Sequence, residues 1–165
     1  MEKNNESLIK NMLIKYKLKP SKGLGQNFLV NKIVLDNIIK AAEISQNNTI
    51  LEIGPGLGVL TKKLAEKAKK VITIEKDKKL IEILKNELKE FNNIEIINAD
   101  ALKFPESALP AGEYKVVANI PYYITSPLIR KFLEAKNQPT SIILMIQKEV
   151  AKRIVATNKK ESLIS

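Results

Sequence analysis

The sequence contains no cysteine and no histidine. Without cysteine there is no disulfide and no thiolate metal site, and without histidine a zinc site or a histidine general base is excluded. No stretch approaches the roughly 18 apolar residues of a membrane-spanning helix, and the first residues lack the apolar core of a signal peptide. We therefore expect a cytoplasmic protein without a metal centre and without a membrane segment.

The composition is that of one globular domain with an excess of positive charge. Apolar residues make up 44% of the 165 residues, and the formal net charge is +10. This charge is consistent with a solvated lysine-rich surface or with a polyanionic partner such as RNA. We expect residues 1–32 to be a basic segment that packs on a domain formed by residues 33–165. Its lysines either contact RNA or form a solvated tail.

Apolar periodicity predicts strands that alternate with helices. Residues 6–16 and 33–42 have helical spacing, and from Thr49 onward short apolar strands precede amphipathic helices. This order is typical of βαβ units and of a doubly wound parallel sheet, so the predicted fold class is α/β. The strands are predicted at 49–53, 71–75, 94–99, 114–119 and 141–147, and the helices at 60–70, 78–91, 126–135 and 148–156.

Two features of these predicted elements are specific enough to be tested. Pro127 is expected in the first turn of its helix, where its missing N–H costs little. The strand 141–147 is continuously apolar, which is typical of a strand buried on both faces.

A glycine cluster, "LEIGPGLG", follows the first predicted strand. Gly54 and Gly56 let a ligand approach the backbone at the start of the next helix. The dinucleotide fingerprint needs a third glycine where Val59 stands, and no Gly-Lys-Ser/Thr follows, which argues against NAD and against a phosphate-binding loop. Glu52 precedes the loop and suits a ligand with a positive centre. A lone glycine loop is weak evidence, and the acids that follow strengthen it.

Carboxylates follow the next two strands. Glu75 ends the second strand 21 residues after Gly54, a spacing typical of an acid that holds ribose hydroxyls. Asp100 follows the third strand and can accept a hydrogen bond from the exocyclic amine of a base. Open α/β sheets bind ligands at the carboxyl ends of their strands. We therefore predict that Gly54, Gly56, Glu75 and Asp100 bind a nucleoside-type cofactor.

The fourth strand ends in Asn119-Ile120-Pro121-Tyr122. The amide oxygen of Asn119 and the carbonyl of Ile120 can accept both protons of an exocyclic amine, while Pro121 stiffens the turn. Tyr122 can stack on the base that carries the amine. Two acceptors would localise the nitrogen lone pair toward an electrophile, with no need for cysteine or histidine. The alternative is that Asn119 is a turn residue and Tyr122 a core aromatic.

Five segments occur in order between residues 22 and 154: "KGLGQNFLVN", "LEIGPGLGVLT", "NADAL", "NIPYYITSPL" and "MIQKEVAKRI". Together they resemble the rRNA adenine N6-dimethyltransferase family, which uses S-adenosylmethionine and has a Rossmann-like fold. The bacterial branch that acts on two adjacent adenosines near the 3′ end of small-subunit rRNA is the most similar. The resemblance implies S-adenosylmethionine contacts at Asn27, Leu29, Gly54, Glu75, Asp100 and Asn119.

The resemblance implies dimethylation of rRNA in a pre-ribosomal particle, during ribosome biogenesis. Members of the family continue beyond this chain with a strand, a hairpin and a helical domain, so we expect a five-stranded sheet that is incomplete at its C-terminal edge. A cofactor- and RNA-binding fragment without turnover is therefore an alternative. A large-subunit rRNA methylase conferring antibiotic resistance is a lesser one. A DNA adenine methylase is disfavoured, because it usually has a second proline where Ile120 stands.

Overall fold

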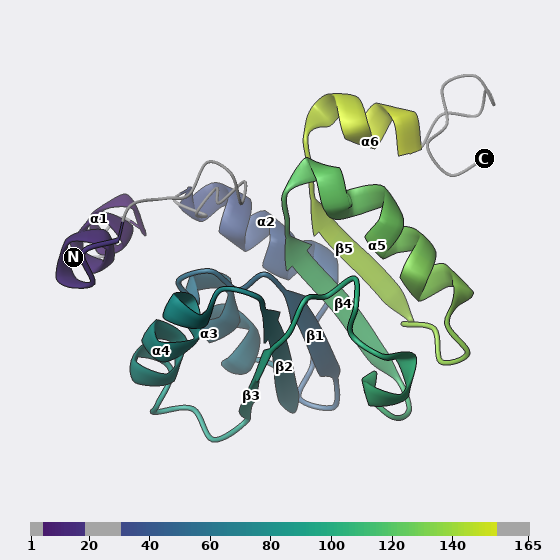
Figure 1. The fold of residues 1–165 in the computed structure, drawn as a ribbon, viewed down its shortest axis with the longest axis horizontal. Coiled ribbons are helices and arrows are strands. Elements are labelled where there is room, and N and C mark those ends of the chain that lie inside the picture. Colours follow the sequence, from purple (N-terminus) through teal and green to yellow (C-terminus); the bar gives the residue numbers. More distant parts are fainter. Residues whose placement is uncertain (1–4, 19–30, 155–165) are drawn as a thin grey trace.

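The computed structural model describes residues 5–18 and 31–154, in which strands and helices alternate as predicted (Figure 1). A short 3₁₀ helix, η2 (Glu106–Ala108), lies between the third and fourth strands. The strands are β1 (Thr49–Ile53), β2 (Lys70–Glu75), β3 (Ile94–Asn98), β4 (Tyr114–Asn119) and β5 (Ser141–Met145). The helices are α1 (Asn5–Lys15), α2 (Lys32–Ala42), α3 (Val59–Ala65), α4 (Lys78–Glu87), α5 (Tyr122–Glu134) and α6 (Lys148–Ile154).

The five strands form one sheet in the order β3-β2-β1-β4-β5. All four pairings are parallel, which confirms the predicted α/β sheet. The central strand β1 pairs Ile53 with Ile74 of β2 and with Ala118 of β4. Because the strands are parallel and in register, the segments that follow β1, β2 and β4 leave the sheet at the same edge.

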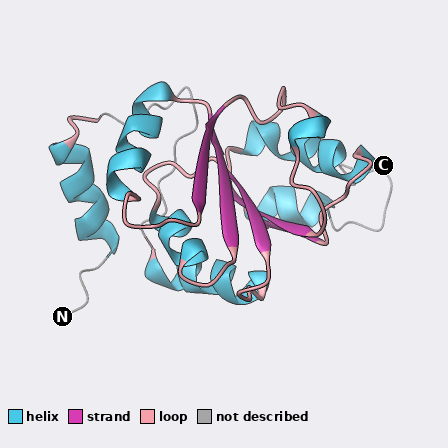
Figure 2. Ribbon diagram, turned by 90° about the horizontal axis from the view of Figure 1, so that it is seen from below, coloured by secondary structure: helices cyan, strands magenta, loops and turns pink. Residues whose placement is uncertain are grey.

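Helices cover both faces of the sheet (Figure 2). Alternate residues of β1 point to opposite faces. Ile50 packs in one cluster with residues of α2 and α3, whereas Leu51 and Ile53 pack in another with residues of α5. From Ile50 onward both faces of β1 are buried, and these residues are apolar except for Glu52.

Helix α1 packs away from the sheet, against α4 and the segment after β1. Its buried residues Ile9 and Met12 share a cluster with Leu57, Leu80 and Ile83. A residue spacing of three between Ile9 and Met12 places both on one face of the helix.

The prediction for Pro127 was wrong. Helix α5 begins at Tyr122, so Pro127 lies inside it and not in its first turn. The reason is Pro121, whose extended ψ of 142° makes it the N-cap residue. Pro127 is exposed, so its ring meets no packed neighbour, although it removes one backbone hydrogen bond from the helix.

Strand β5 is also less buried than predicted. Its five residues are all partly exposed, because β5 pairs only with β4 within the described part of the sheet. The continuous apolar run of β5 therefore belongs to a strand that, within the described residues, has a neighbouring strand on one side only. Within the described residues, 5–18 and 31–154, no helix is both long enough and apolar enough to cross a bilayer.

Candidate active site

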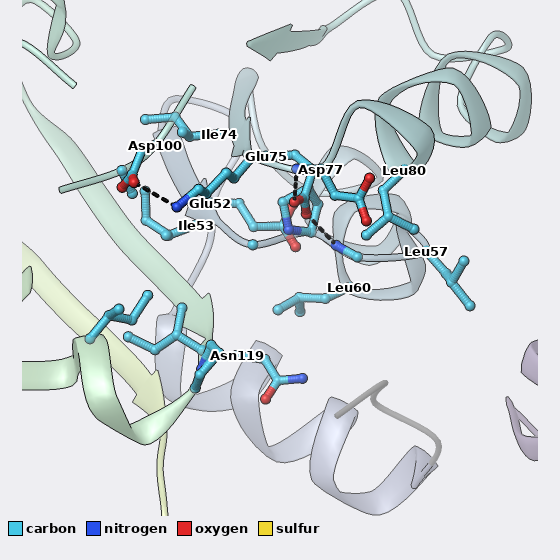
Figure 3. Close-up of a pocket in the computed structure, with 18 of the residues that line it drawn as sticks. Glu52, Ile53, Leu57, Leu60, Ile74, Glu75, Asp77, Leu80, Asp100 and Asn119 are labelled. Carbon is cyan, nitrogen blue, oxygen red and sulfur yellow. Dashed lines mark hydrogen bonds and ion pairs between the residues drawn. The ribbon is translucent and has the colours of Figure 1, made fainter. Parts of the chain in front are cut away.

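A pocket of about 240 Å³ lies at the carboxyl edge of the sheet (Figure 3). It brings together most of the predicted site residues, although they are separated by up to 67 positions in the chain. Asn27 and Leu29 lie outside the described residues, and the side chain of Tyr122 is likewise not described. The predicted residues that line the pocket are Gly54, Gly56, Glu75, Asp100, Asn119, Ile120 and Pro121.

The glycine loop connects β1 to α3. Gly54 has a φ of +68°, a conformation that residues with a Cβ rarely adopt. At Gly58 a side chain is disfavoured for a steric reason, because a Cβ there would lie 3.0 Å from the Leu84 side chain of α4. The two glycines therefore let the chain turn sharply after β1 and bring the start of α3 close to α4.

Backbone N–H groups of two segments hold the Glu75 carboxylate: one lies in the glycine loop and the other follows β2. Its Oε1 accepts a hydrogen bond from Asp77 N at 2.8 Å, and its Oε2 accepts one from Gly56 N at 3.4 Å. The residue is 8% exposed, and burial raises the pKa of its carboxyl. Glu75 thus ties the glycine loop to the end of β2, and its carboxylate retains acceptor positions for a ligand.

Asp100 follows β3 and is more exposed than Glu75. Its Oδ1 accepts a hydrogen bond from Leu102 N, and its Oδ2 lies 3.0 Å from Lys76 Nζ. The hydrogen bond from Lys76 holds the pKa of the Asp100 carboxyl below its usual range. Lys131 of α5 donates to the carbonyls of Ala101 and Leu102, which fixes the loop that carries Asp100.

The end of β4 forms the other side of the pocket, where Asn119 lies across from Glu75 and Asp100 (Figure 3). Ile120 is 7% exposed and belongs to the core cluster of the α5 face, so the chain is anchored directly after Asn119. Pro121 then begins α5. Tyr123 is 54% exposed and also lines the pocket.

Glu52 is the most deeply buried carboxyl of the pocket, at 1% exposure. Neither of its oxygens has a hydrogen-bond partner among the described residues, and the neighbouring hydroxyls of Thr61 and Thr73 are equally unsatisfied. Burial raises the pKa of Glu52 to about 8. The nearby Thr61 hydroxyl lowers this pKa but makes no well-formed hydrogen bond to the carboxyl. A carboxyl buried in this way fits a ligand that brings a positive charge or an N–H group.

Sequence reasoning missed the apolar wall of the pocket. Leu57, Leu60 and Leu80 line it, as does Ile9 of α1. The helical spacing within residues 6–16 indicates a short helix, but it does not single out Ile9 or say what the helix packs against. Only a contact across more than 40 positions places Ile9 at the pocket.

Within the described ranges, no three acidic, histidine or cysteine residues are grouped so that they could hold a metal ion.

The sheet order, the glycine loop and the acidic end of β2 define a Rossmann-like methyltransferase domain. Two solved structures support this class. A dimethyladenosine transferase from Plasmodium falciparum is 41% identical, with a TM-score of 0.72 over 79% of this chain and 47% of that protein. The 23S rRNA methyltransferase ErmE is 35% identical, with a TM-score of 0.69 over 77% of this chain and 50% of that protein.

The family follows from the sequence comparisons. The model of the ribosomal RNA adenine dimethylase family matches residues 17–165. Ribosomal RNA small subunit methyltransferase A of Clostridium botulinum (strain Loch Maree / Type A3) is 52% identical over 149 residues, which are 89% of this chain and 54% of that protein. The chain belongs to the ribosomal RNA adenine dimethylase family, and it spans about half the length of the curated relatives it matches.

Proposed function

We propose that this chain carries the cofactor-binding and catalytic part of an enzyme that dimethylates N6 of two adjacent adenosines near the 3′ end of small-subunit rRNA. One observation carries the proposal. A single pocket joins the carboxylates that follow β2 and β3 to the Asn119–Pro121 segment that follows β4. Family membership supports the same reaction.

The cofactor in this proposal is S-adenosylmethionine, which supplies an electrophilic methyl group on a sulfonium. Glu75 accepts the ribose hydroxyls and Asp100 accepts the adenine amine, while the glycine loop allows close approach. Glu52 offers a buried carboxyl to the cationic end. Asn27 and Leu29 stay predicted contacts on the strength of the resemblance alone.

The target amine is held by acceptors of the chain. In the first transfer, the Asn119 amide oxygen and the Ile120 carbonyl accept the two N–H groups of the amine, so the nitrogen lone pair is directed away from the ring. The methylated amine has lost one proton, so in the second transfer its remaining N–H binds one of the two acceptors. Pro121 restricts the turn that carries the carbonyl. Tyr122 stacks on the target base, an interaction worth about 1–3 kcal/mol.

The proposed substrate is small-subunit rRNA in a pre-ribosomal particle, in the cytoplasm. The relative named for the small subunit is 52% identical to this chain, compared with 35% for the 23S rRNA methyltransferase structure. The net charge of +10 favours a polyanionic substrate. These comparisons favour the small-subunit substrate over the large-subunit alternative.

The test is methyl transfer from radiolabelled S-adenosylmethionine to purified small-subunit particles that lack the modification. We expect label in N6,N6-dimethyladenosine at adjacent positions, with large-subunit particles and duplex DNA as control substrates. Cofactor binding measured by calorimetry without any transfer would support the binding fragment instead. No cofactor binding would refute the proposal.

A further inference from the structure

Helix α1 forms part of the pocket although it precedes the glycine loop by about 40 residues. Ile9 is 3% exposed and lines the pocket. It shares a cluster with Leu57 of the glycine loop and Leu80 of α4, and both of these residues line the pocket as well. Helix α1 therefore completes the apolar wall that Leu57 and Leu80 form on this side of the pocket.

Glu87, the last residue of α4, fastens α1 to the domain. Its Oε1 accepts a hydrogen bond from Tyr16 Oη at 2.6 Å and one from Lys15 Nζ at 2.7 Å. Lys62 of α3 lies 3.6 Å from the other carboxylate oxygen. The Glu87 side chain is only 15% exposed, and hydrogen bonds to a partly buried carboxylate are the stronger kind.

The direction of the Glu87 pKa agrees with this geometry. Hydrogen bonds from Lys15 and Tyr16 hold the pKa of the Glu87 carboxyl below its usual range. The carboxylate is thus charged near neutral pH, in the form that accepts both bonds.

We propose that Glu87, through Tyr16 and Lys15, is a positioning residue that holds α1 against the glycine loop and so sets the affinity for the cofactor. The inference rests on the cofactor pocket of the proposed function. When α1 moves away, Ile9 leaves the wall, and Leu57 and Leu80 face water. Docking of α1 and cofactor binding are then linked, and linkage is reciprocal: the cofactor also stabilises the docked helix.

The direct test measures the Kd of S-adenosylhomocysteine by calorimetry for the wild-type chain, Tyr16→Phe, Glu87→Gln and the double variant. We expect each single change to raise Kd about 3- to 10-fold, because each weakens a hydrogen bond to a charged group. The fold-increase in Kd of the double variant should be smaller than the product of the two single fold-increases, since both changes act on one contact. Glu66→Gln is the matched control: it removes an exposed 2.9 Å pair with Lys63 on α3 and should leave Kd unchanged.

A second readout separates positioning from simple destabilisation. Hydrogen exchange of the α1 amides should slow when S-adenosylhomocysteine binds the wild-type chain. In Ile9→Ala, the affinity for S-adenosylhomocysteine should fall while the amides of the sheet remain protected from exchange. For the methyl-transfer reaction, Glu87→Gln should raise the KM for the cofactor with kcat nearly unchanged.

The outcomes are distinguishable. Wild-type binding with an unchanged Kd in Tyr16→Phe, Glu87→Gln and Ile9→Ala, or hydrogen exchange of α1 that does not respond to the ligand, would overturn the inference and leave the proposed function standing. A lower Tm for Glu87→Gln with an unchanged Kd would assign Glu87 a structural role only, which also overturns it. If the wild-type chain does not bind S-adenosylhomocysteine, the cofactor assignment fails and the inference fails with it.

Discussion

The two halves of the pocket differ in charge. The half at the carboxyl ends of β1, β2 and β3 contains charged or ionisable side chains, whereas the lining from β4 and α5 contains no charged side chain among the described residues. The first half holds the carboxyls of Glu52, Glu75, Asp77 and Asp100 and the ammonium of Lys76. The carboxyls suit a cofactor with a cationic centre and several N–H and O–H donors. The other half offers neutral acceptors, which suit an uncharged amine. The contrast predicts that substitutions on the two sides affect different kinetic constants.

The halves also differ in how they are held rigid. Glu75 and Asp100 are fixed by backbone N–H groups and by Lys76. The Asn119 side is fixed by the chain itself, since Ile120 is buried in the core and Pro121 restricts the start of α5.

The largest effect is expected from Asn119→Ala. Loss of one acceptor for the target amine should lower kcat by about 100- to 1,000-fold, as for other groups that act mainly in the transition state. Cofactor Kd should change by less, although the resemblance also implies a cofactor contact at this residue. Single-turnover methyl transfer and calorimetry measure the two constants. Asn92→Ala, at an exposed loop position, is the control; equal losses in kcat and affinity would remove the distinction between the halves.

Glu52→Gln should change how stability depends on pH. Burial raises the pKa of Glu52 from its ordinary value of 4.5 to about 8 in the folded chain. Between these values the unfolded chain loses the proton and the folded chain keeps it, so the free energy of unfolding falls as pH rises. The variant lacks this decline. The difference in free energy of unfolding between the variant and the wild type should therefore shift in favour of the variant by a few kcal/mol from pH 5 to pH 8.

Urea unfolding at several pH values, without cofactor, measures this difference. Glu95→Gln removes an exposed acid of β3 that does not line the pocket and serves as the control substitution. If the curve of Glu52→Gln ran parallel to that of the wild type, Glu52 would titrate normally, and the buried, unpartnered carboxyl would no longer distinguish the cofactor half.

Glu75→Gln should weaken cofactor binding about 10- to 100-fold, since a charged acceptor is replaced by a neutral one. We expect kcat at saturating cofactor to change little, because Glu75 lies across the pocket from Asn119 (Figure 3). Calorimetry and steady-state kinetics test this split. A fall in kcat with an unchanged Kd would place Glu75 in the catalytic half.

Asp100→Asn should have the smallest effect. Its carboxylate is partly exposed and paired with Lys76, so we expect a loss in cofactor affinity of about 3- to 10-fold. The sharper measurement compares an adenine cofactor analogue with its hypoxanthine counterpart. The wild type should prefer adenine, and the variant should lose that preference; an unchanged preference would mean that Asp100 does not contact the amine.

Much of the site could be predicted from the sequence because it depends on short-range patterns. Gly54, Glu75, Asp100 and Asn119 each follow or end an apolar strand, and parallel strands in register bring such residues to one edge. The position of Pro127 in its helix was mispredicted, because a proline inside a helical pattern suggests a first turn while Pro121 had already started the helix. The burial of β5 was overestimated, since an apolar run does not reveal whether a neighbouring strand is present.

By itself the sequence determined the order of strands and helices and the residues that end each strand, because side-chain periodicity and glycine conformation act over a few positions. Only the tertiary structure decided that Ile9 closes the pocket, that Glu87 holds α1 through Tyr16, and that Glu52 is buried without a partner. These features depend on contacts between segments distant in the chain. Such contacts follow from how the helices pack on the sheet, which no local pattern records.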